Sequence, residues 1–280
     1  MQGHTPVLIV GGGPVGLALA AELGWRGIAC TLVEQGDGGI ATPKMNEVNV
    51  RTMEFCRRWG IADDVMNCPF PGDHPLDVAF VTSLFGHELG RIVRPARNHQ
   101  TPEPASPYRL QACSQIWFDP LLLKLARSFA GVTIKHRHRL ESFVQDGDGV
   151  TAEITDLASG ASHTLRADYL VGCDGAASLV RRTLGITLTG KGTLGYPINM
   201  FFRAPDLLKQ SGRRPATFFI PVDRGGVWGN LRIIDPARGV WRLMVDQAGD
   251  DMTPETADRE GYLNRALGRE VAVEWIDVNV

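Results

Sequence analysis

Three glycines at fixed spacing near the amino terminus constrain this chain more than any other feature. Gly11, Gly13 and Gly16 satisfy the pattern G-x-G-x-x-G directly after the apolar run Val7–Val10. In such a motif the first glycine allows a tight turn out of a strand, the second lets backbone approach a pyrophosphate, and the third lets the next helix pack closely on the sheet. With Pro14 at the first helical position, the segment predicts a strand, a phosphate-binding turn and a helix.

The residues that follow extend this prediction to a βαβ unit. We expect the helix over Val15–Trp25, with Gly27 just past its end, and a second buried strand over Cys30–Val33. Glu34 ends that strand about 20 residues after the glycine turn, where a carboxylate accepts hydrogen bonds from ribose hydroxyls and repels a 2′-phosphate. Glu34 and its neighbour Gln35 therefore join the predicted site, which favours FAD or NAD over NADP.

Composition excludes several classes of protein. The 280 residues carry a net charge of −2, so no basic surface for nucleic acid is expected. The apolar run Val7–Leu23 has no preceding Lys or Arg and is interrupted by glycines, which argues against a signal peptide or membrane span. We expect a cytoplasmic protein without a metal site. Its five scattered cysteines are expected to be buried thiols: Cys30, Cys56, Cys68, Cys113 and Cys173.

Hydrophobic periodicity predicts an α/β fold in which a Rossmann-like FAD-binding domain with an inserted β-meander precedes a sheet-rich substrate domain. The FAD-binding domain is placed at residues 1–70 and 105–188, and the substrate-domain segments at 71–104 and 189–280. An amphipathic helix is predicted over Val50–Trp59, and residues 67–108 are expected to be mostly irregular apart from a strand at Asp77–Val81. A helix is predicted over Phe118–Phe129, with Asp119 as its cap and Pro120 at its first position.

Short β-runs separated by Asp-Gly and Ser-Gly turns then predict the meander, in four strands: Val132–His136, Glu141–Gln145, Val150–Ile154 and His163–Arg166. A separate apolar strand, Tyr169–Gly172, precedes a helix over Ala176–Leu184. After residue 190 further strands are predicted, among them Ile198–Arg203 and Val240–Val245. Thr253 is expected to cap a last helix, Pro254–Leu267.

A second cluster follows the strand Tyr169–Gly172. Asp174 and Gly175 form a turn, Ser178 stands at the start of a helix, and Arg181 lies within it. An acidic side chain at such a turn can accept hydrogen bonds from ribityl hydroxyls of a flavin or from nearby backbone amides. From the residues alone, a plain turn with a helix cap is the stronger of these two interpretations.

With this second cluster the chain resembles the single-component, FAD-dependent aromatic hydroxylases related to para-hydroxybenzoate hydroxylase and phenol hydroxylase. Residues 172–181 match the family segment G-C-D-G-x-x-S-x-V-R, which in the family is linked to FAD and NAD(P)H. The resemblance extends to the stretch around Met45 and Asn46, which passes near the flavin. It also extends to Arg51, at the FAD phosphate or ribose, and to Gln115, which touches FAD. It therefore implies FAD contacts for Asp174 and Gly175 as well.

The resemblance also implies an activity. NADPH or NADH reduces the flavin as a transient partner, O₂ adds to it, and the flavin hydroperoxide hydroxylates a small phenolic or other aromatic substrate. No catalytic acid or base is assigned, a homodimer is left open, and neither nucleic acid nor membrane is an expected partner. The family's further Gly-Asp-x-x-His block has no match here, so we expect the C-terminal part of the family to be absent from this chain.

Three other interpretations stay open at this point. The chain could be another FAD oxidoreductase of the same fold, although the Trp-x-Trp of halogenating relatives is absent. It could be a truncated, non-catalytic remnant of the FAD fold, given the missing block. A plain NAD dehydrogenase is the third, and it leaves the second cluster unexplained.

Overall fold

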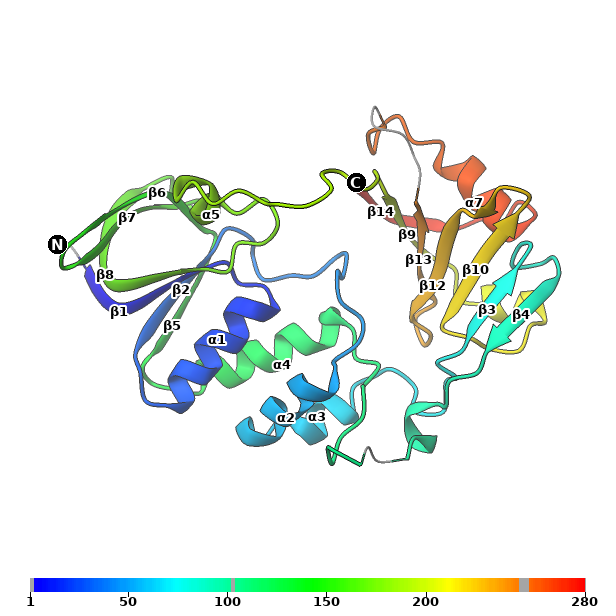
Figure 1. The fold of residues 1–280 in the computed structure, drawn as a ribbon, viewed down its shortest axis with the longest axis horizontal. Coiled ribbons are helices and arrows are strands. Elements are labelled where there is room, and N and C mark those ends of the chain that lie inside the picture. Colours follow the sequence, from blue (N-terminus) through cyan, green and yellow to red (C-terminus); the bar gives the residue numbers. More distant parts are fainter. Residues whose placement is uncertain (1–2, 102–103, 247–251, 280) are drawn as a thin grey trace. The chain divides into compact units, whose positions relative to one another are not determined.

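The computed structural model describes residues 3–101, 104–246 and 252–279. The chain is a mixed α/β protein with two sheets, and it divides into two compact units (Figure 1). Unit 1 comprises Met1–Ile40, Phe55–Val65 and Gln115–Thr189; unit 2 comprises Ala41–Glu54, Met66–Ser114 and Gly190–Val280. Each unit is thus assembled from segments far apart in the sequence. The assignment of FAD-binding and substrate roles to particular residue ranges stays a prediction.

The sheet of unit 1 has six strands in the order β5-β2-β1-β8-β7-β6 (Figure 1). The strands are β1 (Gly3–Val10), β2 (Cys30–Glu34), β5 (Val132–His136), β6 (His138–Asp146), β7 (Gly149–Asp156) and β8 (Ser162–Gly172). Strands β5, β2, β1 and β8 run parallel, whereas β8, β7 and β6 are antiparallel. The predicted strands Val7–Val10 and Cys30–Val33 are confirmed. Their continuous apolar runs are typical of parallel strands buried on both faces.

The meander prediction needs two corrections. The run Val132–His136 is not part of the meander, because β5 pairs in parallel with β2. The runs His163–Arg166 and Tyr169–Gly172 form one strand, β8, which pairs with β7 at its first half and with β1 from Leu165 onward. Strand β8 has an antiparallel neighbour along its first half and a parallel neighbour along the rest. Its first half therefore shows alternating polar and apolar residues and its second half a continuous apolar run, so the sequence suggests two separate strands.

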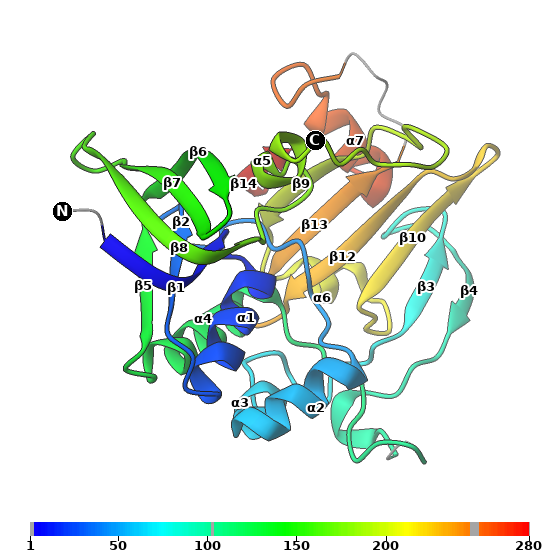
Figure 2. The same cartoon turned by 60° about the vertical axis from the view of Figure 1, so that its left-hand side comes forward.

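Helices α1 (Pro14–Trp25) and α4 (Gln115–Arg127) pack side by side against the parallel strands (Figures 1 and 2). The end of α1 is also close to the chain that follows α4, since a Cβ added at Gly24 would lie 2.6 Å from the ring of Phe129. The shorter helices are α2 (Val50–Trp59), α3 (Ala62–Met66) and α5 (Leu179–Thr183). Helix α2 has the predicted bounds, but α5 is shorter than Ala176–Leu184 because its first residues form a capping turn.

Helix α4 begins at Gln115, so the predicted start at Phe118 is wrong. Pro120 lies inside the helix, where it forfeits one backbone hydrogen bond without ending the helix. Asp119 does not cap the helix. Its side chain is buried, and its Oδ2 accepts a hydrogen bond from Nε2 of Gln115 at 2.9 Å. Asp-Pro is a common helix start, so the local pattern placed the beginning of the helix three residues too late.

The buried Asp119 makes stability depend on pH. Burial, only partly offset by the hydrogen bond from Gln115, raises the pKa of Asp119 to about 6. The native state therefore binds this proton more tightly than the unfolded chain does. The stability that the protonated Asp119 contributes is present at low pH and is lost as pH rises through the folded pKa. Its Oδ1 is also buried without a hydrogen-bond partner in the described residues.

We expect Asp119→Asn to stabilise the protein at pH 8 by about 1–2 kcal/mol, because it removes the cost of a poorly solvated charge. Urea unfolding at pH 8 and pH 4 measures the effect. The gain should shrink toward zero at pH 4, where Asp119 is protonated in the native state. A gain of equal size at both pH values would contradict this explanation.

The sheet of unit 2 follows the order β14-β9-β13-β12-β10-β3-β4, with β11 paired to β10. Its strands are β3 (Val78–Val81), β4 (Glu88–Ile92), β9 (Ile198–Arg203), β10 (Phe218–Asp223), β11 (Gly226–Val227), β12 (Gly229–Asp235), β13 (Val240–Val245) and β14 (Glu274–Asn279). Helix α7 (Arg259–Leu267) packs against one face, where its Leu263 and Leu267 share a buried core with Phe202 and Trp241 (Figure 2). Two short helices, η1 (Arg97–His99) and α6 (Leu207–Ser211), complete the unit.

The predicted strands Ile198–Arg203 and Val240–Val245 are confirmed to the residue. Strand β4 was missed, because Glu88–Ile92 is mostly exposed and shows no apolar alternation. The last helix starts at Arg259, so the predicted cap is wrong: the side chain of Asp258 accepts the N–H of Gly261. No helix within the described residues is both long and apolar enough to cross a bilayer.

The cysteines are all free thiols. Four are buried as expected, but Cys173 is only half-buried, and two of the buried thiols are not isolated. Cys68 and Cys113 are hydrogen-bonded to each other, and Nη1 of Arg97 lies 3.2 Å from Sγ of Cys68. The contact with Cys113, which outweighs burial, and the charge of Arg97 lower the pKa of Cys68 to about 6. Their separation in the sequence concealed this pair.

Candidate functional site

The glycine turn joins β1 to α1 at the carboxyl end of the parallel strands. Gly11 has a φ of +106°, and a Cβ there would lie 2.4 Å from the carbonyl oxygen of Cys173. A Cβ at Gly16 would lie 1.9 Å from the carbonyl oxygen of Gly11, so only glycine permits this helix-to-strand approach. Pro14 occupies the first turn of α1, as predicted. The tight turn expected at Gly11 and the close helix packing expected at Gly16 are therefore both found in the structure.

Gly13 differs from the other two glycines. It is the N-cap of α1, with an ordinary extended backbone at φ −73°, and a Cβ built on it would meet nothing within 4 Å. The first turn of a helix presents N–H groups that have no partner within the helix and carries the positive end of the helix dipole. The open space beside Gly13 is thus where an anionic group can approach the backbone, and it fits a pyrophosphate.

Glu34 lies beside this turn. Its Oε2 accepts the N–H of Gly12 and its Oε1 accepts the N–H of Gly36, each at 2.6 Å. These two bonds hold the carboxylate at the end of β2, and each carboxylate oxygen retains a further lone pair for a ribose hydroxyl. The adjacent Gln35 is exposed.

The second cluster lies next to the first, although more than 150 residues separate them in sequence. Strands β1 and β8 are neighbours in register, with Val10 opposite Gly172, and the N–H of Cys173 donates to the carbonyl of Val10 at 2.7 Å. A Cβ at Gly11 would also lie 2.9 Å from the backbone nitrogen of Asp174. The carboxyl ends of β1, β2 and β8 therefore gather the glycine turn, Glu34 and Asp174 in unit 1.

The side chain of Asp174 is engaged locally. Its Oδ1 accepts from Ser178 Oγ at 2.6 Å and its Oδ2 from the N–H of Val180 at 3.2 Å, while Ser178 Oγ accepts from the N–H of Arg181. Burial raises the pKa of Asp174, but the hydrogen bonds from Ser178 and the backbone outweigh it and lower the pKa overall. This is the turn-and-cap arrangement favoured from the residues alone. Gly175 has a φ of +79° and open space at its Cα.

The remaining predicted residues have varied surroundings. Gln115, in unit 1, is buried and donates to Asp119. In unit 2, Asn46 is buried and accepts from Ser114 Oγ at 2.9 Å, Met45 is half-buried, and exposed Arg51 donates to Glu54 at 2.7 Å. Their roles toward FAD stay predictions.

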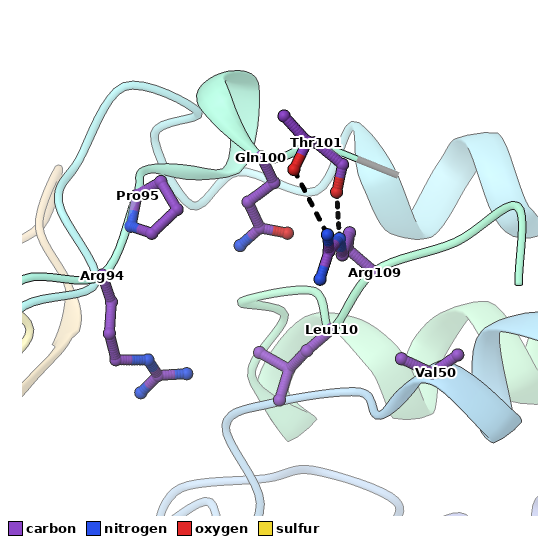
Figure 3. A pocket seen from close by; sticks show the side chains of 7 residues that line it. All are labelled: Val50, Arg94, Pro95, Gln100, Thr101, Arg109 and Leu110. Carbon is purple, nitrogen blue, oxygen red and sulfur yellow. Dashed lines mark hydrogen bonds between the residues drawn. The ribbon is translucent and has the colours of Figure 1, made fainter. Parts of the chain in front are cut away.

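Unit 2 also contains a hollow of about 240 Å³ that the sequence did not indicate (Figure 3). Arg109 lies at its rim and donates to Thr101, through Nη2 to Oγ1 at 3.3 Å and through Nε to the carbonyl oxygen. The other lining residues are Val50, Arg94, Pro95, Gln100 and Leu110. None of these seven residues belongs to the predicted site.

Sequence reasoning also missed two arginines within predicted strands of unit 2. Arg232 in β12 and Arg242 in β13 lie directly opposite each other. The Nε atom of each is buried and has no hydrogen-bond partner among the described residues. A charged residue inside an otherwise apolar strand was the available signal.

Comparison with known proteins identifies the family. A family model described as the FAD binding domain matches residues 4–278. Tetracenomycin B2 monooxygenase-dioxygenase of Streptomyces olivaceus is 34% identical in an alignment 287 residues long, which covers 95% of this chain and 51% of the relative. The chain belongs to the FAD-binding monooxygenase family. It spans about half the length of the curated relatives it matches.

Solved members of this monooxygenase family share the fold. The rebeccamycin biosynthetic enzyme RebC with reduced flavin is 38% identical, with a TM-score of 0.89, over 100% of this chain and 52% of RebC. A ternary complex of aklavinone-11 hydroxylase with FAD and aklavinone is 30% identical, with a TM-score of 0.83, over 100% of this chain and 54% of the hydroxylase. The expected family and fold class are therefore confirmed, and this chain has an FAD-binding domain.

Proposed function

We propose that this chain binds FAD at the glycine turn and forms part of a monooxygenase that hydroxylates an aromatic substrate. The observation that carries the proposal is the open phosphate position at Gly13, set in the first turn of α1 beside Glu34. Family membership favours FAD over NAD as the nucleotide that fits this position. When bound, FAD would supply the redox and oxygen chemistry, with NADPH or NADH as reductant and O₂ as co-substrate.

The chain's own residues would bind and orient the cofactor. Backbone N–H groups at Gly13 and the first turn of α1 would hold the pyrophosphate, and Glu34 would hold the adenosine ribose. Gln35, Gln115, Gly175, Met45, Asn46 and Arg51 are proposed as further contacts. Asp174 would fix the turn after β8 through the hydrogen bonds that its two oxygens accept, and each oxygen keeps a further lone pair for a ribityl hydroxyl.

The visible spectrum of the purified protein tests the cofactor assignment. We expect flavin absorption bands, or their appearance after FAD is added and excess FAD is removed. Oxidation of NADH or NADPH should then be stimulated by members of a panel of phenols and polycyclic aromatic compounds. A colourless protein that does not retain added FAD would refute the proposal.

A second candidate is a domain that binds FAD without hydroxylating anything. The observations at Gly13 and Glu34 concern nucleotide binding alone and fit such a domain equally well. Flavin retention together with nicotinamide oxidation that no aromatic compound stimulates would support this alternative.

A further inference from the structure

Cys68 and Cys113 form a thiol pair inside unit 2. Sγ of Cys68 lies 3.3 Å from the carbonyl oxygen of Ala112, the residue that precedes Cys113, and the two thiols are hydrogen-bonded to each other. Cys68 is 5% exposed and Cys113 is 0% exposed. In the sequence β3, β4 and η1 all lie between them. The fold therefore brings two sulfur atoms together at the two ends of one long segment of the chain.

A guanidinium group lies against this pair. Nη1 of Arg97 donates to Sγ of Cys68 at 3.2 Å, and Nη2 of Arg97 donates to the carbonyl oxygen of Phe70 at 2.9 Å. Neither partner is a carboxylate, so among the described residues a thiolate at Cys68 is the anion that could balance this charge. The thiolate is also the form of cysteine that attacks an oxidant, and an adjacent positive charge favours it.

Two other cysteines show what burial does without such partners. Cys30 and Cys56 are 1% and 0% exposed, and burial raises the pKa of Cys30 to about 11 and that of Cys56 to about 12. The pKa of Cys68 is instead lowered to about 6, because the contacts with Cys113 and Arg97 more than offset burial. Buried cysteines with a purely structural role are unreactive thiols. Packing alone therefore does not account for the surroundings of Cys68.

We propose that Cys68 and Cys113 are a redox-active pair that a small hydroperoxide, such as hydrogen peroxide, oxidises to a reversible disulfide, with Arg97 holding the attacking thiolate. The greater exposure of Cys68 and its contact with Arg97 assign it the attack on peroxide, and Cys113 then resolves the intermediate. This modification site goes beyond the proposed function, because it needs neither bound flavin nor an aromatic substrate.

The reaction balances in two steps. Sγ of Cys68 attacks one oxygen of hydrogen peroxide, the O–O bond breaks, and the hydroxide that leaves takes up the proton released by the Cys68 thiol to form water. Sγ of Cys113 then attacks the sulfur of the resulting sulfenic acid. The S–O bond breaks, the S–S bond forms, and the proton of Cys113 leaves with the hydroxide as a second water. Two thiols lose two electrons in all, and one peroxide gains them.

Peroxide treatment of the folded, purified 280-residue protein tests the pair. The remaining thiols are alkylated after denaturation, and the digested peptides are mapped by mass spectrometry. We expect a cross-link between Cys68 and Cys113 that dithiothreitol reverses. Cys30 and Cys56 should stay reduced, and they serve as internal controls. No cross-link, or oxidation of these controls as fast as of the pair, would overturn the proposal.

The disulfide should also change the melting temperature. Its formation brings two atoms already in contact to a separation of about 2 Å and ties together the two ends of the segment that contains β3, β4 and η1. Cross-links that close long loops constrain the unfolded chain the most. We therefore expect the oxidised protein to melt at least about 3 °C above the reduced protein, and dithiothreitol to reverse the shift.

Variants separate the roles of the three residues. Cys113→Ala should leave Cys68 as a sulfenic acid that dimedone labels, whereas Cys68→Ala should leave Cys113 unlabelled. Arg97→Gln should slow cross-linking about tenfold at pH 7.5, because a pKa near the free-cysteine value of about 8.5 leaves roughly a tenth of Cys68 as thiolate. Arg97→Lys, which keeps the charge, should restore most of the rate.

The matched control is Cys56→Ala, which removes an equally buried thiol without the partners of Cys68. It should cross-link at the wild-type rate. Labelling of Cys113 in place of Cys68, or an unchanged rate in Arg97→Gln, would overturn the assigned roles. If a cysteine variant does not fold, the peptide map of the wild type and the two Arg97 variants still decide.

Discussion

Replacing Gly13 with valine should leave the protein folded and abolish its retention of FAD. The residue has an unstrained backbone, and a Cβ added to it meets no protein atom within 4 Å. We expect the free energy of unfolding to change by less than about 1 kcal/mol, the range of an N-cap substitution. The side chain would instead occupy the space that the pyrophosphate needs. We expect the Kd for FAD to rise about 100-fold or more, close to 3 kcal/mol of binding free energy.

Fluorescence titration with FAD and thermal melting of the same samples measure both quantities. The matched control is Gly147→Val, in the turn between β6 and β7 of unit 1. Gly147 also has open space at its Cα and no left-handed φ. This variant should match the wild type in stability and FAD affinity. An unchanged affinity in Gly13→Val would exclude the glycine turn as the phosphate site.

Replacing Gly16 with alanine should, unlike the change at Gly13, destabilise the fold itself. A Cβ at this position would lie 1.9 Å from the carbonyl oxygen of Gly11 and 3.1 Å from its carbon. Backbone cannot yield as a flexible side chain can, so α1 must move away from β1. We expect a loss of about 3 kcal/mol or more in the free energy of unfolding, at the upper end of overpacking effects.

Urea denaturation measures this loss, and Gly13→Ala serves as the comparison within the same motif. The two alanine substitutions add the same methyl group a few residues apart, so a difference in stability reports the packing around each glycine. Equal stability of the two variants would contradict the close approach of α1 and β1 described above.

The local sequence determined much of unit 1. Continuous apolar runs predicted β1 and β2, the glycine spacing predicted the turn, and an amphipathic pattern predicted α2 to the residue. These features depend on neighbours a few positions apart, where turn geometry and side-chain periodicity act directly. Helix α4 shows the limit. Pro120 and Asp119 together are typical of a helix start, but packing and the Gln115–Asp119 hydrogen bond extend the helix beyond them.

Charge and pairing over long distances were decided by tertiary structure. The sequence could not show that β8 pairs with both β7 and β1, or that this pairing brings Asp174 beside Gly11. Nor could it show that Asp174 would accept hydrogen bonds from its own helix, that Cys68 would meet Cys113, or that Arg232 would lie opposite Arg242. Strand register and burial set these contacts, and both depend on segments more than a hundred residues apart. The sequence by itself therefore determined the glycine turn and the family, whereas the folded chain decided which polar and charged groups pair with one another.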